Sequence, residues 1–154
     1  MNRTLFIGVL IFLSGMSFAA DQKKQPNILY IMSDDHAAHA IGAYGGRLAK
    51  LNPTPTLDKL AAEGMLLENT FANNAVCTPS RVSILTGQYS HVNGARSLGA
   101  KLPVEKQYLA HEMRQAGYLT AVIGKWHIGT QPKAFDYYKV FHGQGKYHNP
   151  EFFE

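Results

Sequence analysis

The chain has 154 residues and carries 15 Lys and Arg against 11 Asp and Glu, which gives a formal net charge of +4. This length is typical of a single domain, and 45% hydrophobic residues, with eight Tyr and eight Phe, exclude a disordered chain. The basic residues form no block that predicts nucleic-acid binding, although the positive charge suits an anionic substrate. The single cysteine, Cys77, excludes an intrachain disulfide and a zinc site built from several cysteines.

Residues 1–19 predict a secretory signal peptide. Arg3 supplies a positive start, residues 5–18 are apolar apart from Gly and Ser, and small residues precede a cleavage site before Ala20. The apolar run is shorter than the roughly 20 residues of a membrane-spanning helix, which disfavours a membrane anchor. We therefore expect an exported protein, periplasmic or secreted and free of the membrane after cleavage, with residues 20–25 as a polar leader.

Three apolar segments predict strands, at residues 27–32, 65–72 and 119–123. The first is continuously apolar and ends at a polar cluster, a pattern typical of a buried strand in a parallel sheet. Residues 42–55 are rich in Gly, Asn and Pro and predict a loop.

Helices are predicted between these strands. Pro55 opens one helix and Gly64 ends it, a second follows the segment at residues 77–81 and ends at Gly87, and a third covers residues 107–116. The alternation of strands and helices predicts an α/β sheet with helices on its faces.

Residues 135–154 are aromatic and polar without a clear period, and no element is predicted there. Three strands make a thin sheet. We therefore expect residues 26–154 to be the N-terminal portion of a longer catalytic domain.

Polar clusters accompany the predicted strands and the turns that connect them, at residues 33–36, 77–81 and 124–127. Ligands of open α/β sheets bind at the carboxyl ends of the strands, so these clusters are expected to converge. Asp34 and Asp35 suit a hard divalent cation such as calcium, whereas taken alone they are equally typical of a solvated loop. A zinc site at His36 and His39 is less favoured, because no third ligand is well placed.

The segment at residues 77–87 carries the strongest signal. Pro79 belongs in a first helical turn, so Cys77 is expected just before a helix N-terminus, where free N–H groups favour an anion. Arg81 follows one turn later and adds a planar cation suited to sulfate or phosphate. A cysteine that only fills a core would not need this setting.

Residues 77–87 and 117–127 resemble the two signatures of the formylglycine-dependent sulfatase family, in family order, and the resemblance covers residues 26–154. It implies an alkaline-phosphatase-like α/β sandwich with a mixed, mostly parallel sheet flanked by helices. It also implies hydrolysis of sulfate esters with Ca²⁺ as cofactor.

The resemblance further implies that a maturation enzyme oxidises Cys77 to formylglycine. The modified Cys77 would share the calcium with Asp34 and Asp35. The aldehyde hydrate offers two hydroxyls, one to attack sulfur and one whose deprotonation expels sulfate, an exit that a serine would lack.

Three further residues receive roles from the same resemblance. Arg81 would hold the hydrated aldehyde. Lys125 would bridge the aldehyde and the substrate sulfate, and His127 would contact the second hydroxyl.

The substrate is less defined by the sequence. Residues 135–138 and 143–150 look like bacterial glycan sulfatases of the N-acetylglucosamine-6-sulfatase type, and their aromatic side chains suit sugar faces, although ordinary packing explains them equally well. His142 and His148 are further candidates for substrate contact. A sulfated carbohydrate or an aryl sulfate is the expected partner.

Two alternatives remain open from the sequence. A phosphonate or phosphodiester hydrolase of the same superfamily can carry a similar segment, and a truncated remnant would be inactive. Family members run to several hundred residues and carry further metal ligands, a His acid and a further Lys much later in the chain. We therefore expect the 154-residue chain alone to be inactive.

Overall fold

The computed structural model describes residues 25–154 and separates two units, one ending at Met32 and one spanning Ser33–Glu154. The signal peptide predicted for residues 1–19 and nearly all of the leader lie outside the described residues. None of the helices in the described part of the chain is long and apolar enough to cross a membrane.

The described part of the first unit, residues 25–32, is extended and exposed, with Leu29 84% accessible. The strand predicted at residues 27–32 is therefore wrong for this structure. Apolar residues favour a strand only when a neighbouring strand completes the hydrogen-bond ladder. The sheet among the described residues has two strands, and this segment is neither of them.

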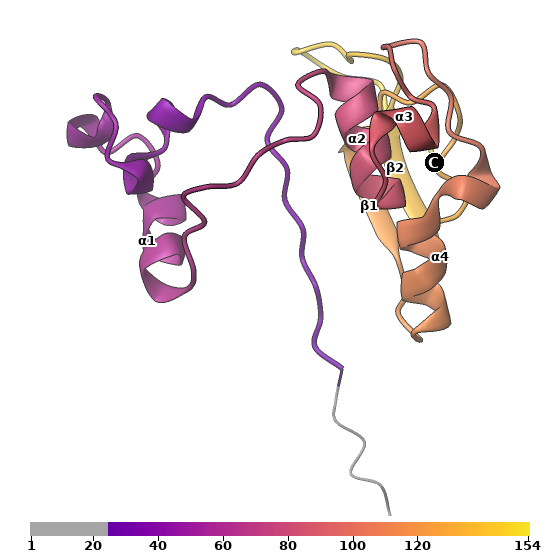
Figure 1. Ribbon diagram of the computed structural model, residues 1–154, viewed down its shortest axis with the longest axis horizontal. Helices are drawn as coiled ribbons and strands as arrows, with labels where there is room; N and C mark the ends of the chain where they lie inside the picture. The colour runs from indigo at the N-terminus through magenta and orange to yellow at the C-terminus, as the bar shows by residue number, and fades with distance from the viewer. Residues whose placement is uncertain (1–24) are drawn as a thin grey trace, which may run out of the picture. The chain divides into compact units, whose positions relative to one another are not determined.

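The second unit, Ser33–Glu154, contains all the helices and strands of the described residues (Figure 1). Its 3₁₀ turns are Ala38–Ala40, Gly42–Tyr44, Ala49–Leu51 and Val104–Lys106. Its helices and strands are α1 (Pro55–Glu63), α2 (Cys77–Thr86), α3 (Ser90–Asn93), α4 (Tyr108–Gln115), β1 (Ala121–Lys125) and β2 (Tyr137–Phe141).

Helix α1 confirms the predicted start at Pro55 and end at Gly64. The carboxylate of Asp58 accepts hydrogen bonds from the Thr54 hydroxyl at 2.9 Å and from the backbone N–H of Ala43 at 2.8 Å. These polar bonds connect the first turn of α1 to Thr54 and to the 3₁₀ turn at Gly42–Tyr44. No residue of α1 is buried.

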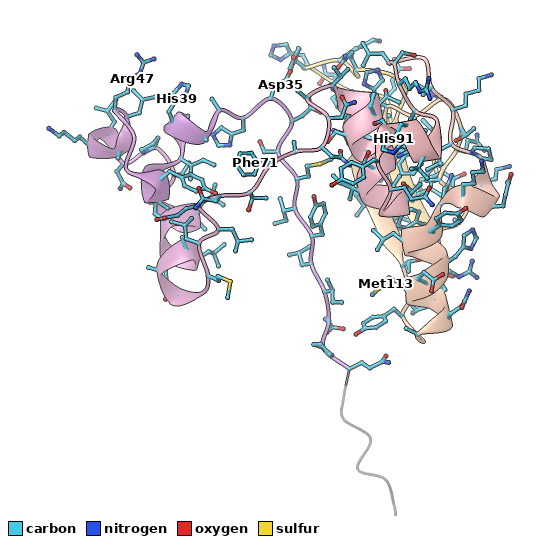
Figure 2. The ribbon with its side chains drawn as sticks, viewed as in Figure 1. Asp35, His39, Arg47, Phe71, His91 and Met113 are labelled. Carbon is cyan, nitrogen blue, oxygen red and sulfur yellow. The ribbon has the colours of Figure 1, made fainter. Side chains whose placement is uncertain are left out.

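The strand predicted at residues 65–72 is also wrong, because this segment is irregular in the structure. Met65, Leu67 and Phe71 are exposed, and Phe71, labelled in Figure 2, is 87% accessible. As at residues 27–32, an apolar run alone does not form a strand when no partner strand pairs with it.

Helices α2 and α4 lie where the sequence predicts helices. Helix α2 begins at Cys77 itself and so includes residues 77–81, which were expected to precede it, and it ends at Gly87 with φ of 65°. Helix α4 is one residue shorter at each end than predicted. Glycine ends α2 because it adopts this left-handed conformation without a steric penalty.

Strands β1 and β2 pair in parallel, from Ala121 beside Tyr137 to Lys125 beside Phe141. The existence of β1 confirms the predicted third strand, with bounds shifted two residues toward the C-terminus. Strand β2 was not predicted, although tyrosine, valine and phenylalanine favour strands. The observed class is a mixed α/β arrangement with a small parallel sheet.

The hydrophobic core lies between α2, β2 and the loops around them. Its members are Val82, Leu85, Ala95, Leu102, Trp126, Ile128 and Val140. Trp126 packs edge-on against Phe135 with ring centroids 6.2 Å apart. This core holds the start of α2 near the end of β1, where the polar clusters of the sequence meet.

Candidate active site

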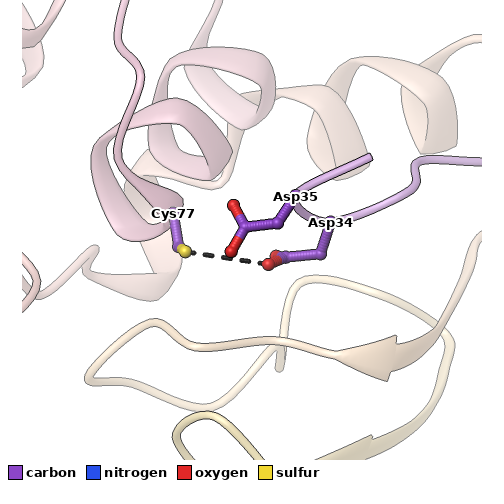
Figure 3. Close-up of side chains that lie close together, drawn as sticks. All are labelled: Asp34, Asp35 and Cys77. Carbon is purple, nitrogen blue, oxygen red and sulfur yellow. Dashed lines mark hydrogen bonds between the residues drawn. The ribbon is translucent and has the colours of Figure 1, made fainter. Parts of the chain in front are cut away.

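Two carboxylates and a thiol lie together in the second unit. Asp34 and Asp35 belong to a bend after residue 32, and Cys77 is the first residue of α2 (Figure 3). One ligand atom from each of the three residues lies within 4.8 Å of the others. The Cys77 thiol is 3.8 Å from Oδ1 of Asp34 and donates toward it.

Two positively charged side chains form ion pairs with Asp34. Arg81 Nη2 lies 2.5 Å from Oδ2 of Asp34, and Lys125 Nζ lies 3.1 Å from its Oδ1. The side chains of Arg81 and Lys125 are only 11% and 14% exposed, so both charges are largely shielded from water. Arg81 also donates to the backbone carbonyl of Lys125 at 2.5 Å, which ties α2 to the end of β1.

Burial and the neighbouring cations have opposite effects on the pKa of Asp34. Partial burial alone would raise the pKa of this carboxyl. The hydrogen bonds and charges of Arg81 and Lys125 outweigh that effect and lower the pKa below its usual value. Asp34 is therefore ionised at neutral pH.

Lys125 reaches the thiol as well as the carboxylate. Its Nζ lies 3.7 Å from Cys77 Sγ and 2.5 Å from the amide oxygen of Gln144. Gln144 lies beyond β2 in residues 143–150, a segment that resembles glycan sulfatases, but the sequence did not predict its contact with Lys125. The flanking Gly143 and Gly145 were the available signal, since paired glycines indicate a sharp turn.

His127 follows two residues after Lys125, near enough for the charges of Lys125, Arg81 and Asp34 to act on its ring. Its backbone has a φ of 49°, which is uncommon outside glycine and is found disproportionately at functional sites. Its ring Nδ1 is buried and has no hydrogen-bond partner among the described residues. Burial, followed by the charges of Lys125 and Arg81, lowers the pKa of His127, so the imidazole is neutral at neutral pH.

Two further features connect His127 to its surroundings. The buried hydroxyl of Thr78 contacts the carbonyl of His127 at 2.7 Å and that of Leu98 at 3.1 Å, which anchors the start of α2 beside Cys77. A cleft of about 290 Å³ lies next to the imidazole, and its walls include Trp126 and Phe141.

Not every candidate residue joins the cluster. Among the described residues, the group close enough to hold a metal consists of Asp34, Asp35 and Cys77, without His36 or His39. His142 stacks on Phe153 with ring centroids 4.0 Å apart and lines the cleft, whereas His148 is not among the residues that line it.

The ligand atoms of Asp34, Asp35 and Cys77 indicate which metal ion this cluster suits. Two carboxylates are hard oxygen ligands of the kind that calcium takes, whereas a thiol is a soft ligand that calcium does not favour. The three residues therefore fit calcium when the Cys77 side chain carries oxygen in place of sulfur.

The chain belongs to the sulfatase family, because the family model "Sulfatase" matches residues 26–153. This membership agrees with the fold, which is mixed α/β of the alkaline-phosphatase-like sulfatase type.

Individual relatives support the assignment. The chain is 39% identical to an N-acetylglucosamine-6-O-sulfatase of Bacteroides thetaiotaomicron over 95% of its length, which is 27% of that relative. It is 41% identical to mouse arylsulfatase G over 74% of its length, which is 23% of that relative.

A solved structure shows the same fold. BT4656, determined in complex with its substrate D-glucosamine-2-N,6-O-disulfate, superposes with a TM-score of 0.78 and 42% sequence identity. The match covers 84% of this chain and 26% of that one. The chain thus spans about a quarter of the length of the relatives it matches.

Proposed function

We propose that the full-length protein that includes this chain is an exported hydrolase of sulfate esters, which acts through a formylglycine derived from Cys77 with calcium beside it. The observation that carries the proposal is the cluster that Asp34, Asp35 and Lys125 form around Cys77. Arg81 completes it through its ion pair with Asp34. The residues come from a bend, a helix start and a strand end, so their proximity is a property of the fold rather than of the sequence order.

The charge of the cluster supports an anionic substrate. The two carboxylates and the two cations balance each other within the protein. Calcium held by Asp34, Asp35 and an oxygen of modified Cys77 would lower the pKa of a bound hydroxyl and neutralise sulfate charge. With calcium bound, the site as a whole would present a net positive charge to the ester.

The chain's own residues have separable roles in this proposal. Arg81 fixes Asp34 and the backbone of Lys125, and so keeps the cluster assembled around residue 77. The Lys125 ammonium, 3.7 Å from Cys77 Sγ, binds the sulfate oxygens and stabilises charge that develops on them. Neutral His127 can accept a proton, since its Nδ1 has no partner among the described residues.

A sulfated carbohydrate is the proposed substrate. The similarity to an N-acetylglucosamine-6-O-sulfatase and to a structure that holds a disulfated glucosamine supports this class. The cleft beside His127 has the aromatic walls that suit a sugar face. A formylglycine-generating enzyme is the proposed maturation partner, and export follows from the signal peptide expected at residues 1–19.

Mass spectrometry of the peptide containing Cys77 tests the proposal directly. The full-length protein is expressed together with a maturation enzyme, and the expected product is an aldehyde at residue 77. The same sample is assayed with an aryl sulfate and with an aryl phosphodiester. A thiol in active protein overturns the formylglycine assignment, and faster turnover of the phosphodiester overturns the substrate class.

Substitution of Cys77 separates folding from chemistry. Cys77→Ala and Cys77→Ser are expected to fold and to lose turnover, because neither provides two hydroxyls on one carbon. Multiple turnovers by the Ser variant near the parent rate would contradict the mechanism. The 154-residue chain assayed alone is expected to release no sulfate.

A further inference from the structure

Gln144 contacts the lysine that faces Cys77. The Lys125 ammonium lies 2.5 Å from Oε1 of Gln144, 3.1 Å from Oδ1 of Asp34 and 3.7 Å from Cys77 Sγ. An ammonium has three N–H donors and no acceptor, so the amide of Gln144 must present its oxygen to Lys125. Asp34 and Gln144 thus occupy two donors, and the third faces residue 77, where the sulfate ester would bind.

The backbone explains how Gln144 reaches Lys125. Lys125 lies beside Phe141 in the parallel ladder, and Gln144 follows three residues after that partner. The Gly145 N–H donates to the carbonyl of His142 at 3.0 Å and closes a turn around Gln144. A Cβ at residue 145 would lie 2.4 Å from the Phe141 ring, so this turn requires glycine there.

The turn therefore depends on Gly145 and on the backbone rather than on the side chain of Gln144, which belongs to an exposed residue. A substitution of Gln144 is expected to leave the fold intact. The contact with Lys125 is the one interaction of the Gln144 side chain recorded in the described part of the chain.

We infer that Gln144 is a positioning residue, which holds the Lys125 ammonium beside Cys77 without neutralising its charge. Asp34 already carries the one carboxylate in contact with Lys125, and it shares that charge with Arg81. A second carboxylate on Lys125 would cancel its remaining attraction for an anionic ester, whereas a neutral amide does not. The inference rests on the proposed function, because it assigns Lys125 to an anionic substrate.

Two variants of the matured full-length protein separate charge from position. Gln144→Glu keeps an acceptor of the same shape and is expected to raise KM for 4-nitrophenyl sulfate and Kd for inorganic sulfate about tenfold each. Gln144→Ala keeps the charge balance and is expected to lower kcat about threefold to tenfold with little change in KM, because Lys125 loses a tether. Gln115→Glu on α4 is the matched control for added charge and is expected to match the parent.

Calorimetric titration with inorganic sulfate needs no turnover, so it distinguishes failure of this inference from failure of the proposed function. A parent protein without sulfatase activity would refute the function, whereas unchanged sulfate affinity in Gln144→Glu would refute the role of Gln144. A melting temperature lowered in both Gln144 variants would show a structural role and would also overturn the inference.

Discussion

Residues 33–76 and residues 77–154 of the second unit are ordered by different interactions. None of the residues in the first region is buried, and its helix α1 is fastened by bonds among Thr54, Asp58 and Ala43. Every buried residue among those described lies in the second region, between Thr78 and Val140. Local polar bonds thus order the first region, and a hydrophobic core orders the second.

The candidate site combines both regions. Asp34 and Asp35 come from the region without buried residues, whereas Cys77, Arg81 and Lys125 come from the region that holds the core. The ion pairs from Arg81 and Lys125 are therefore what fixes Asp34 at the site. We therefore expect substitutions in residues 33–76 to affect activity more than stability. Substitutions of core residues in residues 77–154 should lower the free energy of unfolding.

The largest effect is expected at the metal ligands. Asp34→Ala and Asp35→Ala in the full-length protein should lower calcium affinity together with kcat/KM, by about a thousandfold in rate, because metal-ion catalysis supplies several kcal/mol. Calcium titration and sulfate release measure the two losses. Glu63→Ala, an exposed acid of α1 in the same region, is the matched control and should match the parent. Full activity in excess chelator would contradict the site.

The second effect separates the core from the surface. Leu102→Ala in the chain should cost about 2–5 kcal/mol of unfolding free energy, because Leu102 is 1% exposed within the core. Leu67→Ala, at a residue 58% exposed, should change it by no more than about 0.5 kcal/mol. Urea unfolding followed by the fluorescence of Trp126, the single tryptophan, reports on the core. Equal costs would show that the two regions are not ordered differently.

The sequence predicted features that depend on neighbouring residues better than features that depend on distant partners. The ends of α1 at Pro55 and Gly64, and the end of α2 at Gly87, were predictable because proline and glycine act within a few residues of chain. The strands expected at residues 27–32 and 65–72 failed because a strand requires a partner that the local sequence does not reveal. Strand β2 was not predicted because its residues show no clear hydrophobic period. It forms a strand because it pairs with β1.

The convergence of the three polar clusters was predicted, and the structure brings Asp34, Cys77 and Lys125 together. Among the described residues, however, only Lys125 of these three ends a strand, so the strand-end argument for the convergence holds for one cluster alone. Two contacts at the site were not predicted. Gln144 reaches Lys125 only because a glycine turn follows β2. The bond from Thr78 to the carbonyl of His127 joins residues 49 positions apart, which no local pattern encodes.

The third effect in size is expected at the hydrogen bond from the Thr78 hydroxyl to the carbonyl of His127. Thr78→Ala should destabilise the chain by about 1–3 kcal/mol, because it removes the hydroxyl whose single hydrogen bonds to the carbonyl of His127, the nearer of the two carbonyls it contacts. Thr78→Ser keeps the hydroxyl and should recover most of this loss. Urea unfolding with the Trp126 signal again measures both variants. A serine variant as unstable as the alanine variant would assign the cost to the lost methyl group instead.

The smallest effect is a pH-dependent one at Asp136, in the loop before β2. Its carboxylate accepts bonds from the backbone N–H of Thr120 at 2.8 Å and from the Thr120 hydroxyl at 2.9 Å, and it pairs with Arg114 at 3.0 Å. The Thr120 bonds, and then the Arg114 charge, lower the pKa of Asp136 below its usual 3.8. Stability from this group is present above the unfolded pKa and is lost as the pH falls through the folded one.

Asp136→Asn should therefore lower the melting temperature of the chain slightly at neutral pH. The gap between the variant and the parent should narrow as the pH falls below the ordinary value of 3.8, because the parent carboxylate then becomes protonated. Melting curves across this pH range measure the gap. Glu63→Gln on α1, whose pairing with Lys59 is exposed at 3.8 Å, is the control and should show no comparable gap. A gap for Asp136→Asn that stays constant into acid would mean that the native bonds to Thr120 do not depend on the charge of Asp136.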